Sequence, residues 1–232
     1  MRAHNKEPSI GDCLKKTVAA CLFSGGKESL YALQMVQQQG VEVEHLIYEI
    51  PTFPSPHIVN IEALKTLAES MHKSFTIVKL GTDGVELAET LRKLNVDALV
   101  AGDINVPQHV AWLSEICNRA GGVKLLEPLF GKETLVLFRE MFLASPLSPF
   151  KATIIGVDTK HLGEEWLGFT LSKDTAAEFL SKTQGVDPLG ENGEYHTICV
   201  ESPLYSKNYK IKSIEKTADG RMVFLHVALI EK

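Results

Sequence analysis

The feature that most constrains the fold of this chain is a regular alternation between short apolar runs and helical periodicities. Apolar, partly β-branched runs occupy residues 17–23, 43–50, 74–80, 96–101 and 123–126. Between the runs, apolar residues recur at helical spacing, as in the series Ile58, Ile61, Leu64, Leu67 and Met71. Parallel strands need crossover connections, and helices are the usual ones. We therefore predict an α/β fold built on a doubly wound parallel sheet.

The alternation changes after Glu127-Pro128, where a second part of the chain begins. Its patterns predict a helix over 132–144, a strand over 152–157, a helix near 174–184 and strands at 197–201, 209–217 and 222–230. We expect three parts in all, which are a loosely ordered leader at 1–16, a first subdomain at 17–127 and a smaller α/β subdomain at 128–232.

Composition excludes several classes of function. The net charge of −5 over 232 residues shows no basic excess, so we expect no stable nucleic-acid binding. No apolar run reaches the about 20 residues that cross a membrane, so we expect no membrane partner. The four cysteines are scattered without any CxxC pair, which predicts neither a zinc site nor a disulfide framework. A cytoplasmic location is the simplest expectation.

A small-residue loop, Ser24-Gly25-Gly26-Lys27-Glu28-Ser29, follows the first apolar run and opens a helical pattern; we call it the glycine loop. Two glycines let the backbone approach an anion, and the N–H groups at a helix start carry the positive end of the helix dipole. The loop matches neither the Walker pattern nor the dinucleotide-binding pattern. From the residues alone, either an anion cradle or a tight turn without a ligand fits.

As a hexapeptide, the glycine loop resembles the signature Ser-Gly-Gly-x-Asp-Ser of the PP-loop ATP pyrophosphatases, with Glu28 at the Asp position. That superfamily cleaves ATP between the α- and β-phosphates. The resemblance implies that ATP binds to Ser24, Gly25, Gly26, Lys27, Glu28 and Ser29. It also implies Mg²⁺, because the leaving pyrophosphate needs a counter-charge.

Two further blocks hold residues that could carry chemistry. Gly102-Asp103-Ile104 follows the fourth predicted strand, at the sheet edge where α/β proteins bind ligands. The second block is GENGEYHT, residues 190–197, which we call the acidic block. Its residues Glu191, Glu194 and His196 could hold Mg²⁺, bind ammonium or orient a leaving group, or the block could be a solvated turn.

The order and spacing of these blocks resemble the diphthine–ammonia ligase (diphthamide synthase) family over roughly residues 17–206. The resemblance implies that a carboxylate attacks ATP, releases pyrophosphate and forms an acyl-adenylate, from which ammonia displaces AMP. In that family the carboxylate acceptor is diphthine on elongation factor 2. The roles implied are catalysis by Glu191, Glu194 and His196, ATP binding by Gly102 and Asp103 with the glycine loop, and Mg²⁺ binding by Glu28 and Asp103.

The chain departs from the family at two basic positions. His109 stands after Gln108 where the family usually has arginine, and Phe169 replaces the arginine that follows Leu-Gly. These losses, with Glu28, favour a second function, a protein that binds ATP or AMP without turnover. An RNA-modifying PP-loop enzyme is a third alternative, against which the acidic net charge and the absence of a cysteine pair argue. Pyrophosphate release distinguishes the ligase from the binding protein. Dependence of the activity on added RNA distinguishes the RNA-modifying enzyme from both.

Overall fold

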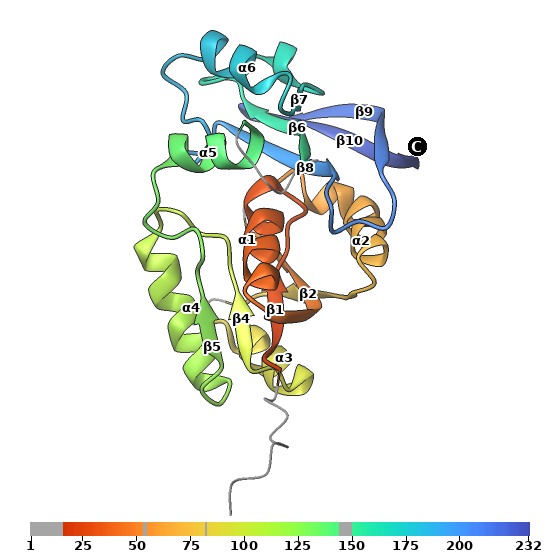
Figure 1. Cartoon of the computed structure of the whole chain (residues 1–232). Coiled ribbons are helices and arrows are strands. Elements are labelled where there is room, and N and C mark those ends of the chain that lie inside the picture. Colours follow the sequence, from red (N-terminus) through yellow and green to blue (C-terminus); the bar gives the residue numbers. More distant parts are fainter. Residues whose placement is uncertain (1–15, 53–54, 82, 144–149) are drawn as a thin grey trace, which may run out of the picture.

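The computed structural model of this protein describes residues 16–52, 55–81, 83–143 and 150–232 (Figure 1). The predicted leader therefore lies, apart from Lys16, outside the described residues. The strands of the first half are β1 (Val18–Leu22), β2 (Glu42–Ile50), β3 (Ser74–Lys79), β4 (Ala98–Val100) and β5 (Lys124–Leu126). The helices between them are α1 (Lys27–Gln38), η1 (Ile58–Asn60), α2 (Ile61–Ser70), α3 (Val85–Leu94) and α4 (Pro107–Arg119).

The first half forms a five-stranded sheet in the order β3-β2-β1-β4-β5, in which every pair is parallel. The predicted doubly wound parallel sheet is confirmed. The strand order reverses at β1, whose neighbours are β2 and β4. In open α/β sheets, ligands bind at the carboxyl ends of the strands next to such a switch point.

Both faces of this sheet are covered, as the apolar strands predicted. Along β1, Ala19 and Cys21 face an apolar cluster with α1 and α2, whereas Ala20 faces a second cluster with α3 and α4. Because successive strand residues point to opposite faces, a strand with helices on both sides needs apolar residues throughout. Every residue from Ala19 to Cys21 is 0% exposed.

The second half forms an antiparallel sheet, a topology that the sequence analysis did not specify. Its strands are β6 (Lys151–Asp158), β7 (Thr170–Leu171), β8 (Tyr195–Glu201), β9 (Tyr209–Asp219) and β10 (Met222–Glu231). Its helices are α5 (Thr134–Phe142), η2 (Glu164–Trp166) and α6 (Ala176–Lys182). The order is β7-β6-β10-β9, and β8 also pairs with β6. The two-residue strand β7 was not predicted.

The antiparallel sheet packs onto the helices of the first half, above α1 and α2 in Figure 1. β8 contacts α1 and β10 contacts α2, and one apolar cluster runs through both parts. The N–H of Cys199 in β8 donates a hydrogen bond to the carbonyl of Gly25, over 2.8 Å. The glycine loop is thus held between the two sheets. The predicted division at residue 127 stays a prediction, because the apolar cluster is shared.

In the described ranges, none of the helices has the length and apolar character needed to cross a membrane.

Candidate active site

The glycine loop has the geometry that its sequence predicted. Gly25 has a φ of +73°, a left-handed conformation that glycine adopts without strain. The two serine hydroxyls lie 3.2 Å apart, and the N–H of Gly26 donates to the Ser24 Oγ over 3.3 Å. Ser29 Oγ donates to the Gly26 carbonyl over 3.1 Å. The loop turns from β1 into α1 with its hydroxyl groups gathered at the start of the helix.

Close backbone contacts explain two of the glycines. A Cβ on Gly26 would lie 3.2 Å from the carbonyl oxygen of Thr197 in β8. A Cβ on Gly102, after β4, would lie 3.1 Å from the carbonyl carbon of Glu28. These are backbone atoms that cannot swing away as a side chain can. The sequence blocks at 24–29, 102–103 and 190–197 therefore meet at one point.

The only side-chain ammonium of the glycine loop is buried and paired. Lys27 is 2% exposed, and its Nζ lies 2.6 Å from Glu28 Oε1 and 4.3 Å from the centre of the Tyr195 ring. Its backbone N–H donates to Thr197 Oγ1 over 3.2 Å. A buried ammonium is retained at low cost only when an opposite charge accompanies it. Glu28, at the position where the signature has aspartate, supplies that charge.

Within the acidic block, Glu194 builds the loop. Glu194 is 3% exposed, and its carboxylate accepts hydrogen bonds from the backbone N–H groups of Asp187 and Asn192, over 3.2 and 2.9 Å. The Asn192 side chain donates a further bond over 3.0 Å. These donors lower the pKa of Glu194 against the effect of burial, which is the largest influence and raises it. Glu194 is absent from the cavity linings described below, so its carboxylate positions the block.

Glu191, in contrast, lines a cavity beside the glycine loop. Burial, followed by the negative charge of Glu28, raises the pKa of Glu191 to about 7. A carboxyl group with a pKa near neutrality can both accept and release a proton under physiological conditions. In the acidic block, Glu194 therefore stabilises the loop, and Glu191 is the glutamate placed to exchange protons with a ligand.

Two histidines from different parts of the chain meet at this cavity. The rings of His57, just before η1, and His196, in β8, lie 5.6 Å apart at 88°. Burial, His196 and Lys27 lower the pKa of His57 to about 3, and burial and Lys27 lower that of His196 to about 4. Both rings are therefore neutral at pH 7.

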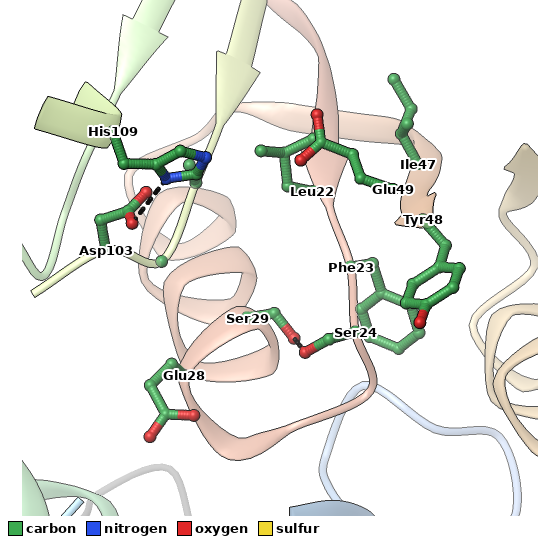
Figure 2. Close-up of a pocket in the computed structure, with 12 residues that line it drawn as sticks. Leu22, Phe23, Ser24, Glu28, Ser29, Ile47, Tyr48, Glu49, Asp103 and His109 are labelled. Carbon is green, nitrogen blue, oxygen red and sulfur yellow. Dashed lines mark hydrogen bonds and ion pairs between the residues drawn. The ribbon is translucent and has the colours of Figure 1, made fainter. Parts of the chain in front are cut away.

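Two cavities adjoin at the glycine loop. Cavity A, of about 220 Å³, lies at the carboxyl ends of β1, β2 and β4 (Figure 2) and is lined by Leu22, Phe23, Ser24, Glu28, Ser29, Ile47, Tyr48, Glu49, Ala101, Gly102, Asp103 and His109. Cavity B, of about 290 Å³, lies between the glycine loop and the acidic block. Both cavities are lined by Ser24, Glu28, Gly102 and Asp103.

Glu49, Asp103 and His109 line cavity A, and Glu127 lies close enough to Asp103 and His109 to interact with them electrostatically. His109 Nδ1 lies 2.8 Å from Asp103 Oδ1, and this hydrogen bond raises the pKa of His109. Burial raises the pKa values of Glu49 and Glu127 to about 7. Figure 2 shows Glu49 and the Asp103–His109 pair around the cavity. The Asp103 carboxyl group therefore favours the protonated form of His109 and is itself engaged by that ring.

The arrangement offers no ready-made magnesium site. The described residues contain no group of three His, Cys, Asp or Glu side chains that could hold a metal ion. Each of the two predicted ligands already has a side-chain partner, Glu28 the ammonium of Lys27 and Asp103 the ring of His109. The donor set does not fit a metal ion held by protein side chains alone.

The sequence-predicted residues thus come together, with two exceptions. Those that line the cavities are Ser24, Gly26, Lys27, Glu28, Ser29, Gly102, Asp103, Glu191 and His196. Gly25 and Glu194 shape the loops behind them. Phe169 packs against Trp166 and Phe179 in an aromatic cluster. Glu49 and His57 were not predicted from the sequence; Glu49 is the penultimate residue of β2, at the same sheet edge as Asp103, which was an available signal.

Comparison with known proteins gives the following matches. The family model described as the diphthamide synthase N-terminal domain matches residues 16–125, and that described as the diphthamide synthase C-terminal domain matches residues 138–232. Among solved structures, the U34-tRNA thiolase NcsA from Methanococcus maripaludis with its 4Fe-4S cluster is similar at 22% identity and a TM-score of 0.35. That match covers 56% of this chain and 58% of the thiolase, less than two thirds of its length. No curated protein sequence matches the chain.

Proposed function

Because this chain belongs to the diphthamide synthase family of ATP-using PP-loop enzymes, we propose that it is an ATP-dependent ligase that forms an amide. It adenylates a carboxylate, releases pyrophosphate and transfers ammonia to the acyl group. The observation that carries this proposal is the meeting of two chemically different cavities at the glycine loop. One suits a nucleoside, and the other suits phosphate groups and a reacting carboxyl group.

Cavity A suits the nucleoside portion of ATP. Its walls include the apolar side chains of Leu22, Phe23 and Ile47, and among the described residues its lining holds no lysine or arginine. Apolar walls with a few polar groups are typical of small-molecule sites. Glu49 and Asp103 supply acceptors for the hydroxyl and amino groups of a nucleoside, which are hydrogen-bond donors.

The phosphates then extend over the glycine loop toward cavity B. The start of α1 supplies N–H groups and the positive end of the helix dipole, and Ser24 and Ser29 supply hydroxyl donors. Lys27 is the one ammonium in the lining of cavity B as described. We propose that the nucleotide draws Lys27 away from Glu28, because phosphate oxygens offer the ammonium a stronger partner.

The reaction follows from these positions. An oxygen of the acceptor carboxylate attacks the α-phosphorus, the bond to the β-phosphate oxygen breaks, and pyrophosphate leaves with its electrons. Ammonia then attacks the acyl carbon, a proton is lost from nitrogen, and AMP leaves. Glu191, with a pKa of about 7, is the residue we assign to accept that proton. His196 lines the same cavity as a neutral hydrogen-bonding group.

The remaining components are proposed from the family. The acceptor is a carboxylate, and diphthine on elongation factor 2 is the candidate that the family suggests. Ammonia is the nitrogen donor, and Mg²⁺ enters with the nucleotide, held mainly by phosphate oxygens. We propose the cytoplasm as the location, where the buried free thiols of Cys21, Cys117 and Cys199 stay reduced.

Phosphorus NMR of the protein with Mg-ATP, ammonium and a cell extract as the source of acceptor tests the proposal. AMP and pyrophosphate should appear together, and at ATP concentrations below saturation the double variant Ser24→Ala, Ser29→Ala should form both about tenfold more slowly. Formation of ADP and phosphate instead would refute cleavage between the α- and β-phosphates.

One observation favours a second candidate, a protein that binds ATP or AMP without turnover. The ammonium of Lys27 is paired with Glu28 and lies over the ring of Tyr195. If that pair never opens, the glycine loop offers no ammonium to stabilise the departing pyrophosphate. The same NMR experiment decides, since this candidate predicts shifted ATP resonances without pyrophosphate in any extract.

A further inference from the structure

The glycine loop has a polar neighbour that the reaction outlined above does not use. His57 lies outside all the sequence blocks, is 8% exposed and lines cavity B. Its Nδ1 is buried and has no hydrogen-bond partner among the described residues. A buried polar atom without a partner is costly, so its presence at a cavity indicates that a bound ligand supplies the partner.

The position of the ring tells which part of a ligand it meets. A Cβ placed on Gly26 would lie 3.7 Å from His57 Cε1, the carbon between the two ring nitrogens. The backbone of Ser24 raises the pKa of His57, against burial, which is the largest influence and lowers it, so the ring lies beside the residue that opens the glycine loop. Its nitrogen-bearing edge therefore faces the N-terminal end of α1, where anions bind.

The fold holds this ring firmly in place. The N–H of His57 donates to Ser55 Oγ over 3.3 Å, and its carbonyl accepts the N–H of Asn60 over 3.1 Å. The Asn60 side chain donates to the carbonyls of Pro56 and Leu225 and accepts the N–H of Val227, each over 2.8 Å. Asn60 thereby ties the segment that carries His57 to β10 of the other sheet.

We propose that His57 is a phosphate-binding residue, whose ring donates a hydrogen bond to the pyrophosphate portion of ATP. This inference rests on the proposed function, because it needs ATP phosphates at the glycine loop. The facing groups are Lys27 from α1 and His196 from β8, and both disfavour a charge on the ring. His57 is therefore neutral with one ring hydrogen, and we assign that hydrogen to the unpartnered Nδ1, beside a loop whose single ammonium pairs with Glu28.

Calorimetric titration with two separate probes, inorganic pyrophosphate and adenosine, tests this assignment. In His57→Phe the ring volume stays but the donor is lost, so pyrophosphate should bind about tenfold more weakly, the loss expected for a hydrogen bond to a charged group. Adenosine, which occupies cavity A, should bind as before. His57→Asn keeps an N–H donor and should retain more pyrophosphate affinity than His57→Phe. The matched control is His72→Asn, at an exposed position with a φ of +55° that asparagine tolerates.

Stability measurements separate a binding role from a structural one. His57→Phe removes an unpaired buried nitrogen, so the variant should resist urea at least as well as the original protein. Unchanged pyrophosphate affinity in His57→Phe would overturn the inference and leave the proposed function standing. If His57→Phe loses affinity for both pyrophosphate and adenosine and is also less stable, the inference is overturned as well, since the ring would then be structural. If the original protein binds neither probe, the proposed function itself fails.

Discussion

The buried pair of Lys27 and Glu28 makes a quantitative prediction about stability. Lys27 is 2% exposed, whereas the Glu28 side chain is 23% exposed. In Glu28→Gln the ammonium stays buried without its partner 2.6 Å away. Breaking a buried pair from one side costs about 3 kcal/mol. In Lys27→Met the apolar replacement fills a similar volume and Glu28 can reach water, so the loss should be about 1 kcal/mol.

Urea denaturation followed by circular dichroism measures this asymmetry. With a slope of about 3 kcal/mol per molar urea, the midpoint of Glu28→Gln should fall by about 1 M. The urea midpoint of Lys27→Met should fall by about a third of the shift expected for Glu28→Gln. A matched control is Glu62→Gln, which removes the partner of Lys65 from an exposed ion pair, also 2.6 Å long; the change there should stay within about 0.5 kcal/mol.

Binding should follow the opposite order. Lys27→Met should lose ATP affinity, because it removes the ammonium that phosphate needs, whereas Glu28→Gln frees that ammonium. The reasoning is refuted if Lys27→Met is the less stable variant of the two. It is equally refuted if Glu28→Gln unfolds at the same urea concentration as the original protein.

Three further predictions concern the rest of the site. The double variant Ser24→Ala, Ser29→Ala should bind ATP about tenfold more weakly by calorimetry, while its melting temperature stays within a few degrees. Unchanged affinity would show that the two hydroxyl groups do not bind ATP. At a fixed concentration of free ammonia, amide formation should rise with pH through about 7 as Glu191 loses its proton, and Glu191→Gln should remove this dependence from the pH–rate profile; a profile that survives in the variant would assign the base elsewhere. Glu194→Gln should spare ATP binding but abolish product, because the acidic block loses the carboxylate that organises it, and full turnover would show that the block is only a turn.

The parts of this account that the sequence predicted are those set by local patterns. The strand, glycine loop and helix at 18–38 follow from apolar spacing and small residues, which act within a few positions of the chain. Asp103 was placed at the same sheet edge because the carboxyl ends of parallel strands lie together. Periodicity also predicted nearly every strand, with β7 the exception because two residues carry no periodicity.

The parts that escaped prediction depend on how the antiparallel sheet packs on α1 and α2. No local pattern indicates that Thr197 accepts the N–H of Lys27, or that Tyr195 lies over its ammonium. Nor does the sequence tell which glutamate of the acidic block faces the cavity. Glu194 turns to the loop N–H groups after Gly193, whose φ of +83° reverses the chain. His57 escaped because the role proposed for it depends on its place beside Gly26, a residue distant in the sequence.

The central claim is that a carboxylate, and not water, attacks the α-phosphorus of ATP. The most direct test is the mass of the AMP formed when the protein, Mg-ATP, ammonium and acceptor extract react in water enriched in ¹⁸O. The account predicts AMP without ¹⁸O, formed with pyrophosphate, because the incoming oxygen belongs to the acceptor carboxylate. AMP or pyrophosphate that carries ¹⁸O would show attack by water and would contradict the ligase mechanism.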